Sequence, residues 1–277
     1  MPYSIKTCFS YYIGFFFFIA NIYSQNDWVD YVVQKDKGIM SISIDLSYKY
    51  QRSNYKNLLI VGSNYRDCLK NGFPTPKGLE KLYAFSDSTA TIIDRLTKNK
   101  LVGIITYQCY GLDVYYVKDT LNIRKDLNKM FKENFSLSNN YIHIKRDPIW
   151  YYYLVNLYPE SDTNDHLADH QFLNELVLKG DDLSGKRKIN HWIYFKSNSF
   201  KNDNRKLKVY DKFRGLKFSI DSLNYKGAGT YPYELQVSRK DSVNPKSIAE
   251  LTYMLKNLSR SLNGRYEGWR TELKIQD

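Results

Sequence analysis

Near its C-terminus the chain reads PKSIAELTYMLKNLSRSLN over residues 245–263, followed at once by GRYEGW over residues 264–269. In the first segment, apolar residues recur at steps of three and four and form one stripe along a helix: Ile248, Leu251, Leu255, Leu258 and Leu262. Gly264 can adopt the left-handed conformation that ends a helix. The aromatic residues beyond it predict a closing strand, so this helix leads into the last strand of a sheet.

The residues before this helix predict the rest of that sheet. Alternating and β-branched residues indicate strands at 189–195, 216–223 and 233–237, and a polar helix is expected at 197–214. With the helix and closing strand described above, the order is strand, helix, strand, strand, helix, strand. A ferredoxin-like split βαβ arrangement is the simplest topology with that order.

The first half of the chain interleaves strands and helices, with more hairpins than crossovers. Strand patterns lie at 28–34, 39–46, 58–62, 101–107, 112–117 and 141–145. Helical periodicity follows Pro76, as one broken helix or two consecutive segments, and it returns at 123–134. This pattern favours the α+β class, with mainly antiparallel sheets and helices packed on them, over a doubly wound parallel sheet.

The length of the chain indicates two folded domains. It has 277 residues, of which 43% are hydrophobic, and this supplies enough apolar material for two cores. The polar segment 159–165 is the best candidate boundary. We therefore divide the chain into a signal segment at 1–25, an α+β domain at 26–160 and a ferredoxin-like domain at 161–277.

The first 25 residues have the pattern of a secretory signal peptide. Lys6 precedes an apolar run from Tyr11 to Ala20, and the small residue Ser24 closes the segment. A membrane-spanning helix needs about 20 apolar residues, and this run is shorter. We expect an exported protein, periplasmic or extracellular, without a stable membrane span after cleavage. Ile22, which is large for its place before a cut at Ser24, leaves an uncleaved anchor open.

Cys68 and Cys109 are the cysteines that remain after such a cleavage. An oxidising compartment permits a disulfide between them, and two free buried thiols fit the sequence equally well. Neither cysteine has a second cysteine or a histidine close by in the sequence, so the pair offers no metal-site spacing.

The formal net charge of +12 is spread over both halves of the chain. Lys and Arg exceed Asp and Glu by five over residues 26–160 and by six over residues 161–277. Nucleic-acid-binding proteins concentrate such an excess on one face or helix, and Lys186-Arg187-Lys188 is the single compact basic triplet. A solvated turn before a strand explains this triplet better, so a nucleic-acid partner is not expected.

Histidines are the residues that could most easily carry chemistry. His166 and His170 are four apart on an expected helix, a spacing that can hold one ion, but the glutamate of a zinc-protease helix is missing between them. His191 lies in a strand without a recognisable Ser or Cys nucleophile nearby, which favours a structural role. His143 alternates with Ile142 and Ile144, so it is expected on the outer face of its strand. The sequence predicts no metal site.

The glycine loops and the aromatic run Trp150-Tyr151-Tyr152-Tyr153 are the other patterns with a possible ligand. Gly227-Ala228-Gly229 precedes a strand, whereas the dinucleotide fingerprint follows one, so no cofactor is expected. If the aromatic run is a strand, Trp150 and Tyr152 share one side and Tyr151 and Tyr153 the other. One pair would then fill the core, and the other could form a stacking surface.

The C-terminal half resembles a bacterial family, the regulator of ribonuclease E activity B, a ferredoxin-like protein inhibitor. The resemblance covers about residues 165–273 and keeps the order of the family's motifs. It depends on Gly180-Asp181-Asp182-Leu183, on Ile189-Asn190-His191-Trp192-Ile193-Tyr194-Phe195, on Leu251-Thr252-Tyr253-Met254-Leu255 and on Gly264-Arg265-Tyr266-Glu267-Gly268-Trp269. Glu267 stands where the family has aspartate. The N-terminal half is similar to an uncharacterised bacterial domain that often precedes this module, through the Trp28 hairpin and Asp147-Pro148-Ile149-Trp150.

This resemblance implies a non-catalytic, protein-binding regulator with ribonuclease inhibition as its precedent. Founding members are cytoplasmic and acidic, whereas this chain is basic and begins with an export pattern, so the identity of the partner and the oligomeric state are open. The motif residues expected to form a binding surface are His191, Trp192, Tyr266, Glu267 and Trp269, of which both tryptophans also fit a core role.

Two alternatives remain at this point. A secreted hydrolase or carbohydrate-binding protein would use His191 with Glu267 as an acid–base pair, and it requires the two side chains to converge in an open pocket. A cytoplasmic ribonuclease inhibitor would require that the N-terminal pattern is not an export signal.

Overall fold

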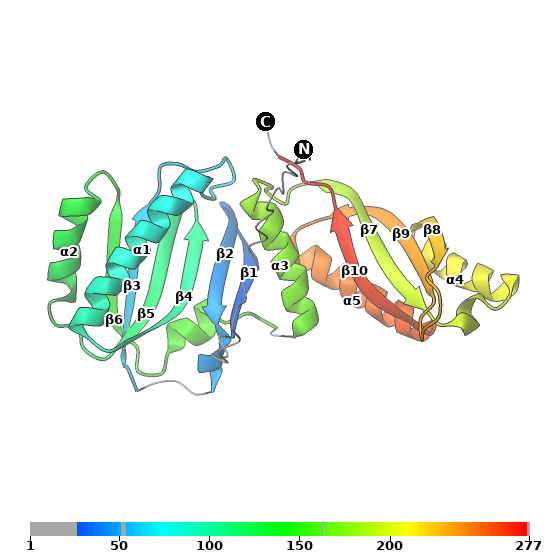
Figure 1. Cartoon of the computed structure of the whole chain (residues 1–277), viewed down its shortest axis with the longest axis horizontal. Helices are drawn as coiled ribbons and strands as arrows, with labels where there is room; N and C mark the ends of the chain where they lie inside the picture. The colour runs from blue at the N-terminus through cyan, green and yellow to red at the C-terminus, as the bar shows by residue number, and fades with distance from the viewer. Residues whose placement is uncertain (1–26, 51–53, 162, 276–277) are drawn as a thin grey trace, which may run out of the picture.

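Alternating apolar residues build two antiparallel sheets in the computed structural model, which describes residues 27–50, 54–161 and 163–275 (Figure 1). The first sheet has six strands in the order β1-β2-β4-β5-β3-β6. Their bounds are β1 (Trp28–Lys35), β2 (Gly38–Asp45), β3 (Asn57–Asn64), β4 (Asn99–Tyr107), β5 (Tyr110–Val117) and β6 (Asn140–Arg146). The predicted hairpins are therefore present as β1–β2 and β4–β5, and the predicted strand at 58–62 is β3, which pairs with β5 and β6.

Both faces of this six-stranded sheet are covered. Helices α1 (Pro76–Leu96) and α2 (Ile123–Asn134) pack on one face. Thr75 starts α1, since its hydroxyl accepts from the Gly78 amide, and the helix is continuous rather than broken. The other face is covered by a short 3-10 helix, η1 (Leu46–Lys49), and by the π-helical turn η2 (Tyr153–Leu157). An apolar core therefore lies on each side of the sheet.

The aromatic run after β6 is helical, and the possibility of a strand there is wrong. Asp147 starts this segment, because its carboxylate accepts from the amides of Tyr151 and Tyr152 at 2.8 and 2.9 Å. The Tyr116 hydroxyl donates to the same carboxylate at 2.6 Å. Trp150 and Tyr153 are both buried, so the run contributes to the core instead of forming a two-sided strand.

The second sheet has four strands in the order β10-β7-β9-β8. Its elements are β7 (Lys186–Phe195), η3 (Ser197–Phe200), α4 (Asp203–Gly215), β8 (Ser219–Tyr225), β9 (Tyr233–Ser242), α5 (Pro245–Ser261) and β10 (Gly264–Thr271). In this order β9 separates β7 from β8, and β7 separates β9 from β10, so two split βαβ units interlock. The predicted α+β class and the ferredoxin-like βαββαβ order are confirmed. The predicted single helix at 197–214 is divided into η3 and α4.

Helix α3 (Asn164–Leu178) lies between the two sheets and contacts both (Figure 1). It packs along β1, the edge strand of the six-stranded sheet, and also against α5. Val32 and Ile39 from the first sheet belong to the same buried cluster as Leu173 and Trp269. The two parts of the chain therefore share apolar contacts at α3.

A disulfide joins Cys68 to Cys109, which settles the choice that the sequence left open. It connects the loop after β3 to the β4–β5 turn. Leu69 and Phe73 of this loop pack in the C-terminal core cluster. Thus a covalent bond within the first part of the chain supports a contact with the second.

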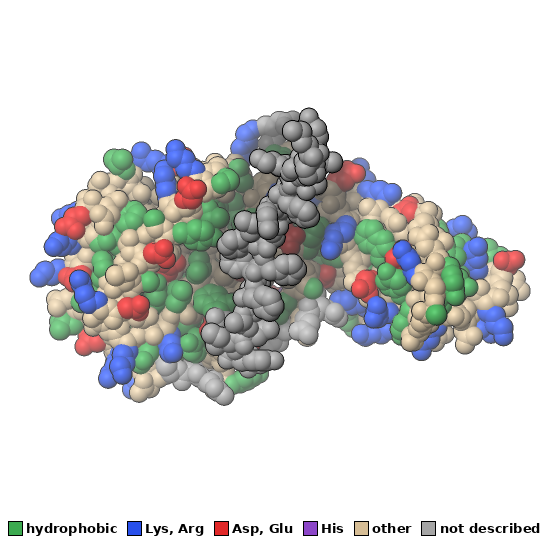
Figure 2. All heavy atoms as spheres, in the orientation of Figure 1, with side chains coloured by type: hydrophobic (Ala, Val, Ile, Leu, Met, Phe, Trp, Pro, Cys, Tyr) green, Lys and Arg blue, Asp and Glu red, His purple; other side chains and the backbone are tan. Residues whose placement is uncertain are grey.

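The predicted signal segment 1–25 lies outside the described residues. Within the part that is described, none of the helices combines the length and the apolar character needed to cross a bilayer. Lys and Arg side chains are distributed over both lobes of the molecule in the face shown in Figure 2.

Candidate functional site

Among the described residues, helices cover the four-stranded sheet on one face only. Along β7, buried residues alternate with half-buried ones, and Ile189, Ile193 and Phe195 point into the core shared with α4 and α5. Trp192 and Tyr194 alternate with these residues and lie on the opposite face. Neither belongs to a hydrophobic cluster of the described residues, so two large aromatic side chains lie on a face without a helix (Figure 1).

A carboxylate cluster lies beside Tyr194 on this face. The Tyr194 hydroxyl donates to Glu234 Oε2 at 2.7 Å, and Lys226 and Asn224 contact Oε1 at 3.0 and 3.3 Å. Burial works to raise the pKa of Glu234, but the hydrogen bonds from Tyr194, Lys226 and Asn224 hold it below its usual range. These contacts therefore fix four side chains, one each from β7, β8 and β9 and one from the loop after β8, in one arrangement.

Cationic side chains border the same aromatic residues. The Arg265 guanidinium lies 5.9 Å from the Tyr194 ring centroid and 5.6 Å from that of Tyr231. Arg265 also binds Glu267 at 2.9 Å, and Lys196 lies 5.7 Å from the Tyr231 ring centroid. The exposed motif residue Glu267 thus belongs to this uncovered face.

The inner face of the sheet buries a polar pair. His191 is completely buried, and its Nδ1 lies 2.9 Å from the Tyr266 hydroxyl. Burial lowers the pKa of His191 to about 3, and the nearby charge of Arg239 acts in the same direction. Its Nε2 is buried and has no hydrogen-bond partner among the described residues. A neutral imidazole that packs in the core cannot exchange protons with a substrate in solvent.

Trp269 and Asp169 connect this sheet to α3. The Trp269 indole donates to Asp169 Oδ1 at 2.9 Å, and the Thr252 hydroxyl from α5 donates to Oδ2 at 2.7 Å. Burial raises the pKa of Asp169, although both hydrogen bonds oppose the change. A single carboxylate therefore joins β10, α3 and α5.

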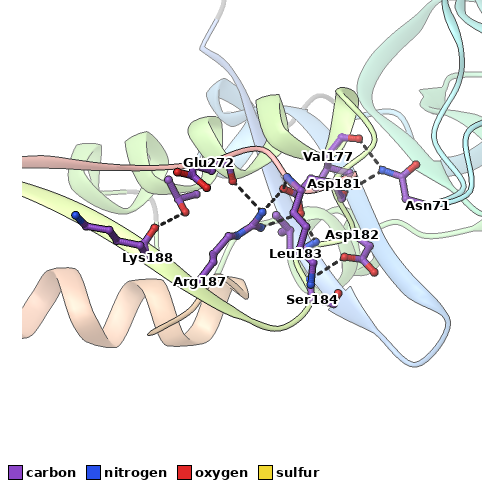
Figure 3. Close-up of polar contacts among 11 residues, drawn as sticks. Asn71, Val177, Asp181, Asp182, Leu183, Ser184, Arg187, Lys188 and Glu272 are labelled. Carbon is purple, nitrogen blue, oxygen red and sulfur yellow. Dashed lines mark hydrogen bonds and ion pairs between the residues drawn. The ribbon is translucent and has the colours of Figure 1, made fainter. Parts of the chain in front are cut away.

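The motif Gly180-Asp181-Asp182-Leu183 forms a second buried polar cluster, close to the first sheet (Figure 3). Arg187 binds both carboxylate oxygens of Asp181 at 2.5 and 2.8 Å. The amides of Leu183 and Lys274 also donate to Asp181, at 2.8 and 2.9 Å. This bidentate pair ties the start of β7 to the C-terminal segment.

The same cluster continues into the first part of the chain. Figure 3 shows the Asn71 side chain pointing at the end of α3, where it donates to the carbonyls of Val177 and Asp181 at 2.7 and 3.1 Å. Asp182 accepts from the Ser184 amide at 2.9 Å and so shapes the turn before β7. The motif supports the junction of the two sheets, and Gly180 and Asp182 also line a cavity of about 240 Å³ there.

The rings of His166 and His170 are neighbours in α3, with centroids 4.3 Å apart and planes tilted by 51°. His170 Nδ1 accepts from the Val32 amide of β1 at 3.3 Å. Burial lowers the pKa of His170 to about 4, and the neighbouring His166 contributes in the same direction. Within the described ranges no group of three or more His, Cys, Asp or Glu side chains is placed to hold a metal ion.

The five predicted binding residues are divided between the two faces of the sheet. His191, Tyr266 and Trp269 point toward the helices, whereas Trp192 and Glu267 lie on the uncovered face. Alternation separates His191 from Trp192 and Tyr266 from Glu267, and a register shift between Tyr266 and Gly268 returns Trp269 to the same face as Tyr266. Of the five, only Trp192 and Glu267 therefore lie on the face without described helices.

The hydrolase alternative required His191 and Glu267 to converge in a pocket, and the structure does not support it. His191 is enclosed, and Glu267 is paired with Arg265 on the other face. The cavity beside Asp169 has a volume of about 280 Å³ and is lined by neither residue.

Comparison with known protein families gives a different match for each part of the chain. Residues 166–271 match the family model Regulator of ribonuclease activity B. The second match covers residues 26–158 and is a family of unknown function, DUF695. Both predicted resemblances are confirmed. A search of curated proteins found no match.

One similar solved structure is that of a proposed glycine cleavage system transcriptional repressor. It is 7% identical, the match covers 78% of this chain and 98% of that one, and the TM-score is 0.23. This low score carries no functional argument.

Three residues of the uncovered face were not among the binding residues predicted from the sequence: Tyr194, Glu234 and Arg265. Alternation along β7 could have indicated Tyr194, because it lies two residues after Trp192. The contact of Tyr194 with Glu234 depends on strand pairing, which a single strand pattern does not specify.

Proposed function

We propose that this protein is a non-catalytic regulator that binds another protein through the uncovered face of its C-terminal sheet. The observation that carries the proposal is the placement of Trp192 and Tyr194 on a sheet face without helices. The match to a family of regulators supports a protein-binding role in general.

The chemistry of this face suits a protein partner. Aromatic side chains with an adjacent Arg are enriched at protein interfaces and provide most of their binding energy. Tyr194, Glu234 and Lys226 are held by mutual hydrogen bonds, so little side-chain freedom is lost when a partner binds.

The partner is proposed to lie outside the cytoplasm. The sequence pattern of residues 1–25 and the Cys68–Cys109 disulfide support export to an oxidising compartment. N-terminal sequencing of the protein recovered from the periplasm or medium tests this part, and recovery of the uncut chain in the cytosol contradicts it.

The binding face is tested with a photo-crosslinking amino acid placed at position 192. Position 253 is the matched control, because Tyr253 is 70% exposed but lies on α5, on the helix side of the sheet. We expect a discrete protein adduct from position 192 and none from position 253. Identical adducts from both positions, or no adduct in cells that contain the native partner, would refute the assignment of the face.

A further inference from the structure

Strand β6 ends the six-stranded sheet on the side farthest from the C-terminal sheet (Figure 1). It pairs with β3 over residues 140–146 without a register shift, and it contains no Pro or Gly. The opposite edge strand, β1, is covered by α3, whereas no described strand or helix pairs with the outer edge of β6. An unpaired edge of this kind can accept another extended chain.

The main-chain groups that face outward on β6 can be identified from the bonds at its two ends. The Asn64 amide donates to Asn139 O, and the Asp147 amide donates to Lys56 O. Because N–H and C=O of one residue point to the same side, the odd-numbered residues of β6 face β3. Ile142 and Ile144 therefore direct their amides and carbonyls away from the sheet. Arg124 of α2 already donates to Ile142 O at 3.3 Å.

The surroundings of this edge are basic. Residues 123–146 contain six Lys and Arg and two acidic residues, Asp126 and Glu133, so most of the positive excess of the first part lies here. Both acids are engaged, Asp126 with Arg95 at 2.9 Å and Glu133 with Lys129 at 3.9 Å. Figure 2 shows Lys and Arg side chains at this end of the molecule, with Asp and Glu side chains among them.

Two side chains on β6 add an aromatic surface beside the basic groups. The rings of Tyr141 and His143 are parallel, with an interplanar angle of 5° and centroids 6.4 Å apart. Tyr141 is 46% exposed, and Lys145 follows on the same side of the strand.

A second copy of this chain is a poor occupant of the edge. Parallel self-pairing would place Lys145 and Arg146 of both copies side by side, and antiparallel self-pairing would place them opposite Tyr141 and Asn140, so neither arrangement gives these charges an acidic partner. Like charges across a strand pair are destabilising. The occupant that complements the edge is an extended segment with carboxylates.

We propose that β6 binds an acidic, extended peptide segment of a partner protein as a seventh strand. The amides and carbonyls of Ile142 and Ile144 pair with the peptide backbone. Lys145, Arg146 and Arg124 bind its carboxylates, with Arg124 turning from Ile142 O to the peptide. This site is independent of the uncovered face of the C-terminal sheet.

The test uses the full chain and two short labelled peptides, one that repeats Glu-Glu-Val-Val, so that carboxylates lie on both faces of the added strand, and the other with Lys in place of Glu. Fluorescence anisotropy measures binding, and hydrogen–deuterium exchange measures the amides directly. We expect the Glu peptide alone to bind and to slow exchange at Ile142 and Ile144. The Ile60 amide, inside the sheet, should not change.

Charge-reversal variants provide the matched control. Lys145→Glu with Arg146→Glu should weaken binding of the Glu peptide by about tenfold or more. Lys179→Glu with Lys246→Glu makes the same change in net charge on the C-terminal part and should leave the affinity within about twofold.

Three results would overturn the proposal. They are equal binding of the two peptides, binding without protection of Ile142 and Ile144, and equal loss in both double variants. Tighter binding of a single-stranded oligonucleotide, again without protection of these amides, would assign the basic edge to nucleic acid instead.

Discussion

The two sheets of this protein differ in how their aromatic residues are used. In the six-stranded sheet both faces are covered, and Trp150 stacks on Tyr116 with ring centroids 3.9 Å apart. In the four-stranded sheet the described helices cover one face, and Trp192 lies on the other. A sheet enclosed on both faces can offer only its edge to a partner, whereas a half-covered sheet can offer a face.

The largest expected difference between the two sheets is the cost of removing a tryptophan. Trp150 is 1% exposed and donates to Tyr55 O at 2.8 Å, so Trp150→Ala should lower the free energy of unfolding by about 3–5 kcal/mol. Trp192→Ala should lower it by about 1 kcal/mol. Urea denaturation of both variants measures the difference, and equal losses would show that the face of Trp192 is covered.

The Asp181–Arg187 pair should be almost as costly to break. Asp181→Ala leaves Arg187, whose side chain is 10% exposed, without its partner, so the expected loss is about 3–5 kcal/mol. Arg95→Ala breaks an exposed pair, with 67% of the Arg95 side chain accessible, and should cost less than about 1 kcal/mol. Urea denaturation again provides the measurement, and a small effect of Asp181→Ala would contradict a structural role for the motif.

The disulfide is next in size, and it tests whether the two parts of the chain depend on one another. Cys68→Ser with Cys109→Ser should lower the free energy of unfolding by about 2–4 kcal/mol. Because Leu69 and Phe73 belong to the C-terminal core cluster, amide exchange should also increase in α3. Hydrogen exchange measured by mass spectrometry checks this. An increase in exchange confined to the first sheet would show that the two parts do not depend on one another through this loop. Added reductant should not change the stability of the double Ser variant, because it has no disulfide to reduce.

The last expected differences concern the pH dependence of stability, which has opposite signs in the two sheets. His191 has a folded pKa of about 3, below the ordinary value of about 6.5, so between these limits the unfolded chain binds more protons. This residue therefore makes the protein less stable as the pH falls through that range. NMR of the His191 ring should show no protonation above about pH 4; titration near pH 6 would contradict its burial.

Asp113 in β5 behaves in the opposite way. Burial raises the pKa of its carboxyl to about 6, partly offset by a hydrogen bond from Ser86, and Oδ2 has no partner within the described residues. The folded chain then binds more protons between about pH 4 and 6, so stability falls as the pH rises through that range. Asp113→Asn should remove this dependence and gain on the order of 2 kcal/mol at neutral pH. Urea denaturation of the native chain and of the variant at two pH values measures this effect. An unchanged pH dependence of stability in the variant would contradict the prediction.

Local periodicity was sufficient to predict most of the fold. Helix α2 was predicted with its observed limits, because Ile123, Leu127, Met130 and Phe131 form a clear apolar stripe. The ferredoxin-like order followed from the sequence of element types. The segment after Pro148 was less certain, because a short apolar run does not distinguish a strand from a buried helix. The carboxylate that caps this segment, Asp147, is also held by Tyr116 from a distant strand.

The candidate site was predicted only in part. The motifs identified the correct strands, β7 and β10, but not the direction of each side chain, because the bulge at Tyr266 and Gly268 breaks the alternation. Contacts such as Tyr194 with Glu234 and Trp269 with Asp169 join residues 40 and 100 positions apart. Strand pairing and helix packing bring these residues together, and neither can be read from a local pattern.

The position of α3 has a consequence for any attempt to study the two parts separately. Truncation at residue 160 would remove the imidazole that accepts from the Val32 amide and would uncover Val32 and Ile39. The shortened fragment would have two unpaired edge strands, β1 and β6, instead of β6 alone. Val32 and Ile39 would be newly exposed beside β1. Such a fragment would stack into insoluble polymers through β1. A fragment that ends after α3, near residue 179, retains its own cover.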